Sequence, residues 1–107
     1  MPATEFVVDV LRDGDTAVLM LAGDVNGAAE SALLDAYHAT GGAGIVLLDF
    51  TGVDYINSTG IALIVGVLAE ARKAGREVQA RGLAEHYREI FRITRLSDFM
   101  TILDDER

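Results

Sequence analysis

The fold of this chain is decided by the segment Ile45-Val46-Leu47-Leu48-Asp49-Phe50-Thr51-Gly52-Val53-Asp54-Tyr55-Ile56-Asn57-Ser58-Thr59-Gly60-Ile61. Its apolar start, residues 45–48, has two β-branched residues and no polar break, which is typical of a strand covered on both faces in a mixed or parallel sheet. We predict a turn next, flanked by Asp49 and Asp54. The residues from Ile61 to Ala74 have helical length and spacing. The segment therefore predicts a buried strand, a loop and a helix.

The junction before this helix is the best candidate for a functional site. Asn57, Ser58 and Thr59 place an amide and two hydroxyls where the first helical N–H groups lack partners. Either Asn57 or Ser58 can cap the helix. A phosphate would also be received well there, because it would meet free N–H groups and the positive end of the helix dipole. The sequence alone leaves both roles open.

The predicted central helix is unusually apolar at its start. One stripe at helical spacing comprises Ile61, Ile64, Val65, Leu68 and Ala71, and Leu63 and Val67 widen it. The charged residues of this helix come only in its last turns. Such a helix is either deeply buried at its start or offers a surface to a partner.

The remaining elements are predicted from periodicity and turn residues. Strands over 5–11 and 16–22 should pair antiparallel across the turn 12–15, and Asn26 should cap a helix over 28–39. A strand over 77–80, a helix from Ala84 that ends at 96–99, and a strand over 100–103 follow. The alternation predicts one α/β domain over 1–107, with helices packed against a largely buried, mixed sheet of four to five strands.

Charge and composition exclude several functional classes. The net charge is −8, and residues 1–71 hold ten acidic side chains with Arg12 as the single base. This field disfavours nucleic acid on the side of the junction, and it either favours a basic partner or serves ordinary solubility. The start Met1-Pro2-Ala3-Thr4-Glu5 has no signal-peptide pattern, and the run 61–69 is too short to span a bilayer. We therefore expect a cytoplasmic protein without membrane insertion.

Catalytic and metal-binding patterns are missing. The chain has no cysteine, and His38 and His86 are predicted on helix surfaces without a second ligand nearby, so we expect no metal site. Asp49 and Asp54 lack a nucleophile or oxyanion site beside them, and Asp49 is predicted to make a strand-end or turn contact. The glycines of 41–44 precede a strand rather than a helix, so they form a linker and not a phosphate loop. We expect neither an enzyme nor a cofactor.

Three arginines are predicted to share one face of the last helix. Arg88, Arg92 and Arg95 have the spacing i, i+4, i+7 and could bind an anion or an acidic partner. They alternate with Glu85 and Glu89, and a solvated, salt-bridged surface is the more common result of such a pattern.

The sequence resembles the STAS family, which includes domains of sulfate transporters and bacterial anti-sigma factor antagonists. The resemblance rests on the initial hairpin, Gly23-Asp24-Val25-Asn26, Val46-Leu47-Leu48-Asp49, the junction 57–61 and Gly75 before a strand. In the antagonists the junction is Asp-Ser-Ser/Thr-Gly-Leu/Ile. Its first hydroxyl is phosphorylated by an anti-sigma factor with a histidine-kinase-like ATPase fold and is restored by a PP2C-type phosphatase.

By position, the resemblance implies Ser58 as the phosphorylation site, with Thr59 as second candidate. It implies a partner-binding surface, which comprises Asp24, Asn26, Tyr55, Asn57, Ser58, Thr59, Gly60 and Ile61. The antagonists usually carry aspartate where this chain has Asn57, and Glu-x-Asp where it has Asp24-Val25-Asn26. The resemblance therefore implies an anti-sigma factor antagonist or, as the alternative, a STAS scaffold or accessory subunit that is never phosphorylated. A nucleotide or small-ligand sensor is a third possibility, and the sequence does not indicate an oligomeric state.

Overall fold

The structure is a computed structural model and describes residues 4–103. Its strands are β1 (Val7–Asp13), β2 (Thr16–Val25), β3 (Ile45–Ile56), β4 (Glu77–Arg81) and β5 (Thr101–Ile102). Its α-helices are α1 (Glu30–His38), α2 (Ser58–Lys73) and α3 (Glu85–Ile93). Two short 3-10 helices are η1 (Gly27–Ala29) and η2 (Leu96–Phe99).

The five strands form one mixed sheet in the order β1-β2-β3-β4-β5. β1 and β2 pair antiparallel, whereas every later neighbouring pair is parallel. A parallel neighbour requires a crossover, and α1, α2 and α3 lie in the three crossovers. The predicted α/β architecture with a mixed sheet is confirmed.

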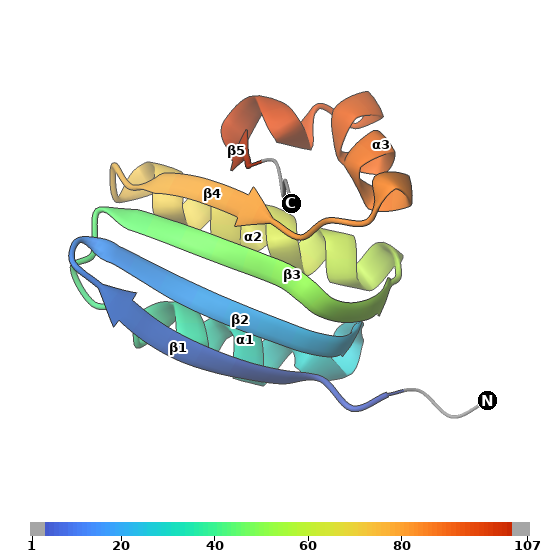
Figure 1. The fold of residues 1–107 in the computed structure, drawn as a ribbon, viewed down its shortest axis with the longest axis horizontal. Helices are drawn as coiled ribbons and strands as arrows, with labels where there is room; N and C mark the ends of the chain where they lie inside the picture. Colours follow the sequence, from blue (N-terminus) through green and yellow to red (C-terminus); the bar gives the residue numbers. More distant parts are fainter. Residues whose placement is uncertain (1–3, 104–107) are drawn as a thin grey trace.

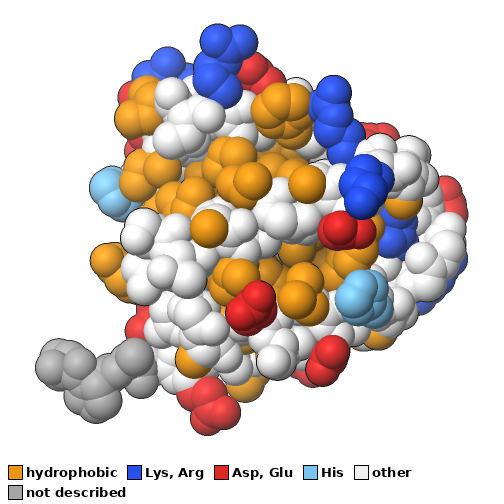
Figure 2. All heavy atoms as spheres, turned by 180° about the vertical axis from the view of Figure 1, so that it is seen from behind, with side chains coloured by type: hydrophobic (Ala, Val, Ile, Leu, Met, Phe, Trp, Pro, Cys, Tyr) orange, Lys and Arg blue, Asp and Glu red, His pale blue; other side chains and the backbone are white. Residues whose placement is uncertain are grey.

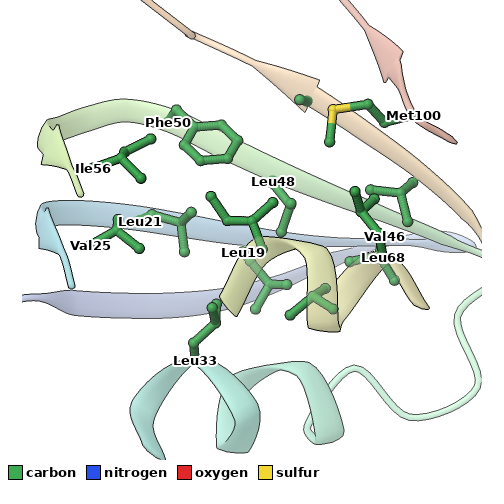
Figure 3. Packing of buried hydrophobic residues seen from close by; sticks show 14 of the residues in the cluster. Leu19, Leu21, Val25, Leu33, Val46, Leu48, Phe50, Ile56, Leu68 and Met100 are labelled. Carbon is green, nitrogen blue, oxygen red and sulfur yellow. The ribbon is translucent and has the colours of Figure 1, made fainter. Parts of the chain in front are cut away.

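The helices α1 and α2 lie behind the sheet in Figure 1, and Figure 2 views the molecule from their side. Between helices and sheet lies the core, where Leu33 of α1 points toward Leu19 of the sheet and Leu68 of α2 lies beside Val46 (Figure 3). α3 joins the same core through Phe91, which is fully buried. Burial of these side chains is the main stabilising term that holds the helices against the sheet.

The prediction that strands end at residues 22 and 48 is wrong. β2 continues to Val25 and β3 to Ile56, because Gly52, Val53, Tyr55 and Ile56 pair with 22–25 across two register shifts. Residues 49–54, predicted as a turn, therefore belong to a strand, and Asp49 lies within it rather than at its end. Asn57 alone separates β3 from α2.

The burial of the 45–48 run is confirmed only in part. Val46, Leu47 and Leu48 are buried, but Ile45 is half-buried. None of the described helices lies in front of the sheet in Figure 1, so they do not cover both of its faces. Leu47 is flanked on its two sides by Val18 and Gln79 of the neighbouring strands.

Other boundaries differ slightly from the predictions. The helix expected from residue 28 begins as η1, which Asn26 caps, and continues as α1 from Glu30. The residues expected only to end the last helix, 96–99, form η2. The glycine after α2, Gly75, has φ +73 and ends that helix as predicted.

Candidate functional site

The candidate site lies where β2 and β3 end and α2 begins. The Asn57 N–H donates to the Val25 carbonyl oxygen at 3.2 Å, which holds the two strand ends together. The Asn57 side-chain oxygen accepts a hydrogen bond from the Gly60 N–H at 2.8 Å. Asn57, and not Ser58, is therefore the helix cap, and one of the free N–H groups at the start of α2 is satisfied.

Gly60 allows the first turn of α2 to lie directly against β2. A Cβ atom at this position would be 2.0 Å from the Val25 carbonyl oxygen and 3.0 Å from a side-chain carbon of Ile56. No other residue fits such a close approach between backbones. The role of Gly60 is thus to position α2, and its buried location keeps it from a partner's side chains.

Ser58 and Thr59 are the exposed hydroxyl residues of the site. Among the residues that the structure describes, Ser58 has no hydrogen-bond partner for its hydroxyl. The Thr59 methyl carbon lies near η1, 3.6 Å from the position that a Cβ on Gly27 would occupy. The Thr59 hydroxyl likewise has no hydrogen-bond partner among residues 4–103, so both hydroxyls are available to a partner.

Asp24 and Asn26 lie near this junction, and their side chains already have partners within the chain. The Asp24 carboxylate accepts from the Thr4 N–H at 3.1 Å, while the Asp24 N–H donates to the Thr4 carbonyl oxygen at 3.0 Å. The Asn26 side-chain oxygen accepts from the Ala28 N–H at 3.0 Å and caps η1. Both side chains are half-buried and stabilise the segments beside the junction.

Tyr55 and Ile61 flank the junction in the sequence and differ in exposure. Tyr55, near the end of β3, is 56% exposed. Ile61, in the first turn of α2, is half-buried and packs against the core. Of these two residues, Tyr55 presents the larger accessible side chain to a partner.

Tyr87 of α3 also takes part in this site, and sequence analysis missed it. Its hydroxyl oxygen accepts a hydrogen bond from the Ile56 N–H at 2.9 Å. β4 pairs with β3 only from Ile45 to Asp49, so Tyr87 supplies an acceptor that β4 does not offer. The available signal is a tyrosine on the buried stripe of an amphipathic helix, because a buried tyrosine hydroxyl needs a partner.

Asp49 has a structural environment rather than a catalytic one. Its carboxylate accepts from the Thr51 N–H at 2.9 Å and forms an ion pair with Arg81 at 3.1 Å. Partial burial opposes ionisation, but the hydrogen bonds from Thr51 and the interactions with Arg81 together hold the pKa of Asp49 below its ordinary value. Asp49 is thus a fixed anion that joins β3 to β4.

The arginines near the last helix are largely paired. Arg92 pairs with Glu89, and Arg95 pairs with Asp98 at 2.7 Å. Arg95 lies beyond the end of α3 with φ +69, so the predicted common helix face does not extend to it. The salt-bridged interpretation is confirmed for Arg92 and Arg95.

Metal-binding clusters and membrane-spanning helices are both absent from residues 4–103. Within that range, no group of three or more histidine, cysteine, aspartate or glutamate side chains is arranged to hold a metal ion. Over the same residues, none of the helices has both the length and the apolar character needed to cross a membrane. His38 and His86 are both exposed.

Sequence comparison finds a family and curated relatives. Residues 8–104 match a family model described as "Mlab, STAS domain". Anti-sigma-B factor antagonists of Listeria monocytogenes and Listeria innocua are each 32% identical to this chain over 99 residues. The matches cover 89% of this chain and 85% of each relative.

Solved structures show the same fold at low sequence identity. The anti-sigma factor antagonist SpoIIAA in its unphosphorylated form has a TM-score of 0.72 at 15% identity. The match covers 95% of this chain and 90% of the SpoIIAA chain. The phosphorylated form of the Bacillus SpoIIAA has a TM-score of 0.72 at 16% identity, with coverage of 96% and 93%. An antagonist from Mycobacterium paratuberculosis has a TM-score of 0.72 at 20% identity, with coverage of 92% and 85%.

Proposed function

This chain belongs to the STAS domain family, and we propose that it is a cytoplasmic anti-sigma factor antagonist that is switched at Ser58. The observation that carries this proposal is the state of Ser58: an exposed hydroxyl at the first residue of α2, with no hydrogen bond to another described residue. A serine needed only for helix capping would have its hydroxyl engaged, but Asn57 makes that contact. Relatives at 32% identity are anti-sigma-B factor antagonists, which supports the same role here.

The proposed partner is an anti-sigma factor with a histidine-kinase-like ATPase fold. In the proposed reaction, the Ser58 hydroxyl oxygen attacks the γ-phosphorus of ATP held by the partner. A phosphate ester forms, the bond to ADP breaks, and the hydroxyl proton passes to a base of the partner. A PP2C-type phosphatase hydrolyses the ester and restores the serine. The chain itself supplies the phosphate acceptor and has no catalytic role.

Phosphorylation at Ser58 would leave the fold intact. A phosphoserine adds about −1.5 to −2 charges, and a helix N-terminus favours negative charge. Residues 1–71 contain Arg12 as their single base, so this half of the chain has little positive charge to neutralise the phosphate. SpoIIAA, a structural neighbour, matches this fold equally well in both its forms, with a TM-score of 0.72 each.

The switch would therefore act on the partner. A partner that covers Ser58 would have to bury the phosphate, and an unpaired buried charge costs several kcal/mol. Tyr55, Ser58, Thr59 and Ile61 would contact the partner. Asp24, Asn26, Asn57 and Gly60 would hold that surface in shape through the contacts described above.

The alternative is a constitutive STAS scaffold or accessory subunit of a stress-signalling or transport complex. The neutral amides of Asn26 and Asn57 favour it, because the antagonists usually carry carboxylates at these two positions and a kinase that recognises those carboxylates would not find them here. In that case Ser58 would contact the partner without being modified.

A capture experiment separates the two functions. The unmodified protein, Ser58→Ala and Ser58→Asp serve as bait in lysate of the host, and bound proteins are identified by mass spectrometry. Gly42→Asp is the matched control, because it adds one charge on an open loop with no atom within 4 Å of the new Cβ. The antagonist function predicts an ATPase-fold anti-sigma factor that is lost only with Ser58→Asp. Equal capture by all four baits would support the scaffold.

A further inference from the structure

The outward face of α2 carries no charge over most of its length. No charged residue occurs from Ser58 to Ala69, yet Ala62, Val65, Gly66 and Ala69 are exposed. An exposed helix face is normally polar, and a continuous apolar face usually marks a contact with another molecule. The exposed fraction of Val65 is 42%.

Gly66 has no role in the fold that explains its identity. A Cβ atom added there would have no atom within 4 Å, and the residue is not in the left-handed region. Glycine inside a helix costs about 1 kcal/mol relative to alanine. The missing side chain leaves a flat place on α2, where a second molecule can approach the helix backbone closely.

A groove borders this flat place. It has a volume of about 190 Å³ and is lined by Val65, Leu68, Ala69, Arg72, Leu96 and Phe99. We name it the α2–η2 groove. Figure 2 shows hydrophobic side chains gathered on the upper half of this side of the molecule, with Lys and Arg side chains beside them. Phe99 is 48% exposed, so the apolar lining is open to a partner.

The basic residue at the edge of the groove, Arg72, forms no ion pair with a carboxylate of residues 4–103. The Arg72 guanidinium lies 4.8 Å from the centre of the Phe99 ring. Charge complementarity therefore favours a partner that brings a carboxylate next to an apolar side chain.

We propose that the anti-sigma factor contacts α2 from Ser58 to the α2–η2 groove, where this partner inserts a large apolar side chain and places a carboxylate on Arg72. This proposal rests on the proposed function. It adds the α2–η2 groove to the surface around Ser58 that the anti-sigma factor would cover. From Ser58 to Ala69 the helix rises about 16 Å. A contact of that length fits a stable interface, which buries roughly 800 Å² on each partner.

The test is the affinity of the purified anti-sigma factor recovered with the Ser58 baits, measured by isothermal titration calorimetry. Gly66→Leu fills the flat place and should weaken binding at least tenfold. Gly42→Leu makes the same change at a second glycine with open space around it and should leave affinity unchanged. Both variants should melt within a few degrees of the unmodified protein, since neither new side chain starts from a clash.

A second pair of variants guards against a folding defect. Ala69→Leu fills the groove itself, and Ala39→Leu makes the same change at the exposed end of α1.

Arg72→Gln tests the charge at the edge of the groove. It should weaken binding severalfold, and more at low salt than at high salt, whereas Arg72→Lys should retain most of the affinity.

The possible results distinguish a failure of the groove proposal from a failure of the proposed function. Normal affinity of Gly66→Leu and Ala69→Leu, with binding still lost in Ser58→Asp, overturns the groove proposal and leaves the proposed function standing. Binding that is indifferent to Ser58→Asp removes the proposed function and this proposal with it. If the unmodified protein alone sediments as a dimer that Gly66→Leu dissociates, a second copy occupies the groove and the proposal is wrong.

Discussion

The two ends of the parallel strands are built differently. Where β3 and β4 begin, Arg76 donates to the Thr40 hydroxyl and to the Ala43 carbonyl oxygen, both at 2.7 Å. The Asp15 carboxylate accepts from the Gly44 N–H at 3.0 Å in the same region. Where β2 and β3 end, Ser58 instead has an exposed hydroxyl that forms no hydrogen bond with any of residues 4–103.

The two ends of the sheet thus differ in whether their polar side chains are already engaged within the chain. At the first end, the polar side chains of Arg76 and Asp15 are engaged in hydrogen bonds that join the loops to each other. At the second end, the side chains of Asn57 and Tyr87 accept hydrogen bonds from backbone N–H groups, and the Asn57 N–H joins the two strands by donating to Val25. Ser58 and Tyr55 are therefore available to a partner.

The largest expected effect is at Gly60. Gly60→Ala would place a Cβ atom 2.0 Å from the Val25 carbonyl oxygen, and backbone cannot move as a side chain can. We expect a loss of about 3 kcal/mol or more in the free energy of unfolding, measured by urea denaturation. Gly66→Ala in the same helix is the control and should gain up to about 1 kcal/mol. Equal effects of the two would refute the close-approach argument.

A substitution at Arg76 tests the end of the sheet where β3 and β4 begin. Arg76→Ala removes two hydrogen bonds from a charged donor and the contact with the Tyr37 ring, whose centre is 5.1 Å from the guanidinium. We expect a loss of about 2 to 3 kcal/mol in urea denaturation. The affinity for the anti-sigma factor should not change. Lys73→Ala, an exposed cation on α2, is the control and should cost less than about 0.5 kcal/mol.

Tyr87 tests whether α3 supports the site. Tyr87→Phe removes the acceptor of the Ile56 N–H, which should cost about 1 to 2 kcal/mol. Amide hydrogen exchange should accelerate at Ile56 more than at Val46 in the same strand. Unchanged exchange at Ile56 would show that another acceptor replaces the hydroxyl.

The smallest expected effect is that of Asp49 on the free energy of unfolding, and it changes with pH in the acidic range. The pKa of Asp49 is lowered in the folded state, so its contribution to stability is present above the ordinary aspartate pKa of about 3.9 and is lost as pH falls through the folded value. Asp49→Asn should cost about 1 kcal/mol or less at pH 7. It should also remove part of the fall in unfolding free energy below about pH 4. An unchanged pH profile would contradict the ion pair with Arg81.

Periodicity is enough to predict the order of strands and helices, because each element has its own apolar pattern. It fails at 49–56, where glycine and aspartate suggest a turn locally. The pairing with residues 22–25 of β2 decides that segment instead, and a long-range contact leaves no local signal. A helix cap at Asn57 or Ser58 follows from residue type and position before an apolar helix, but only the structure shows that Asn57 is the cap.

Side-chain roles at the site are harder to predict. The sequence places Asp24 on a partner surface, but its carboxylate binds the N–H of Thr4, twenty residues away in the chain. Tyr87 is even farther from the residue that it contacts, Ile56. Neither contact has a fixed spacing in sequence, so only the folded structure brings these groups together.

Phosphopeptide mapping tests the central claim most directly. The protein is incubated with its anti-sigma factor and ATP, digested, and analysed by mass spectrometry, with Ser58→Ala and Thr59→Ala as matched variants. We predict one phosphate on Ser58 in the unmodified protein and in Thr59→Ala, and none in Ser58→Ala. An unmodified Ser58, or a phosphate on Thr59 instead, would contradict the account.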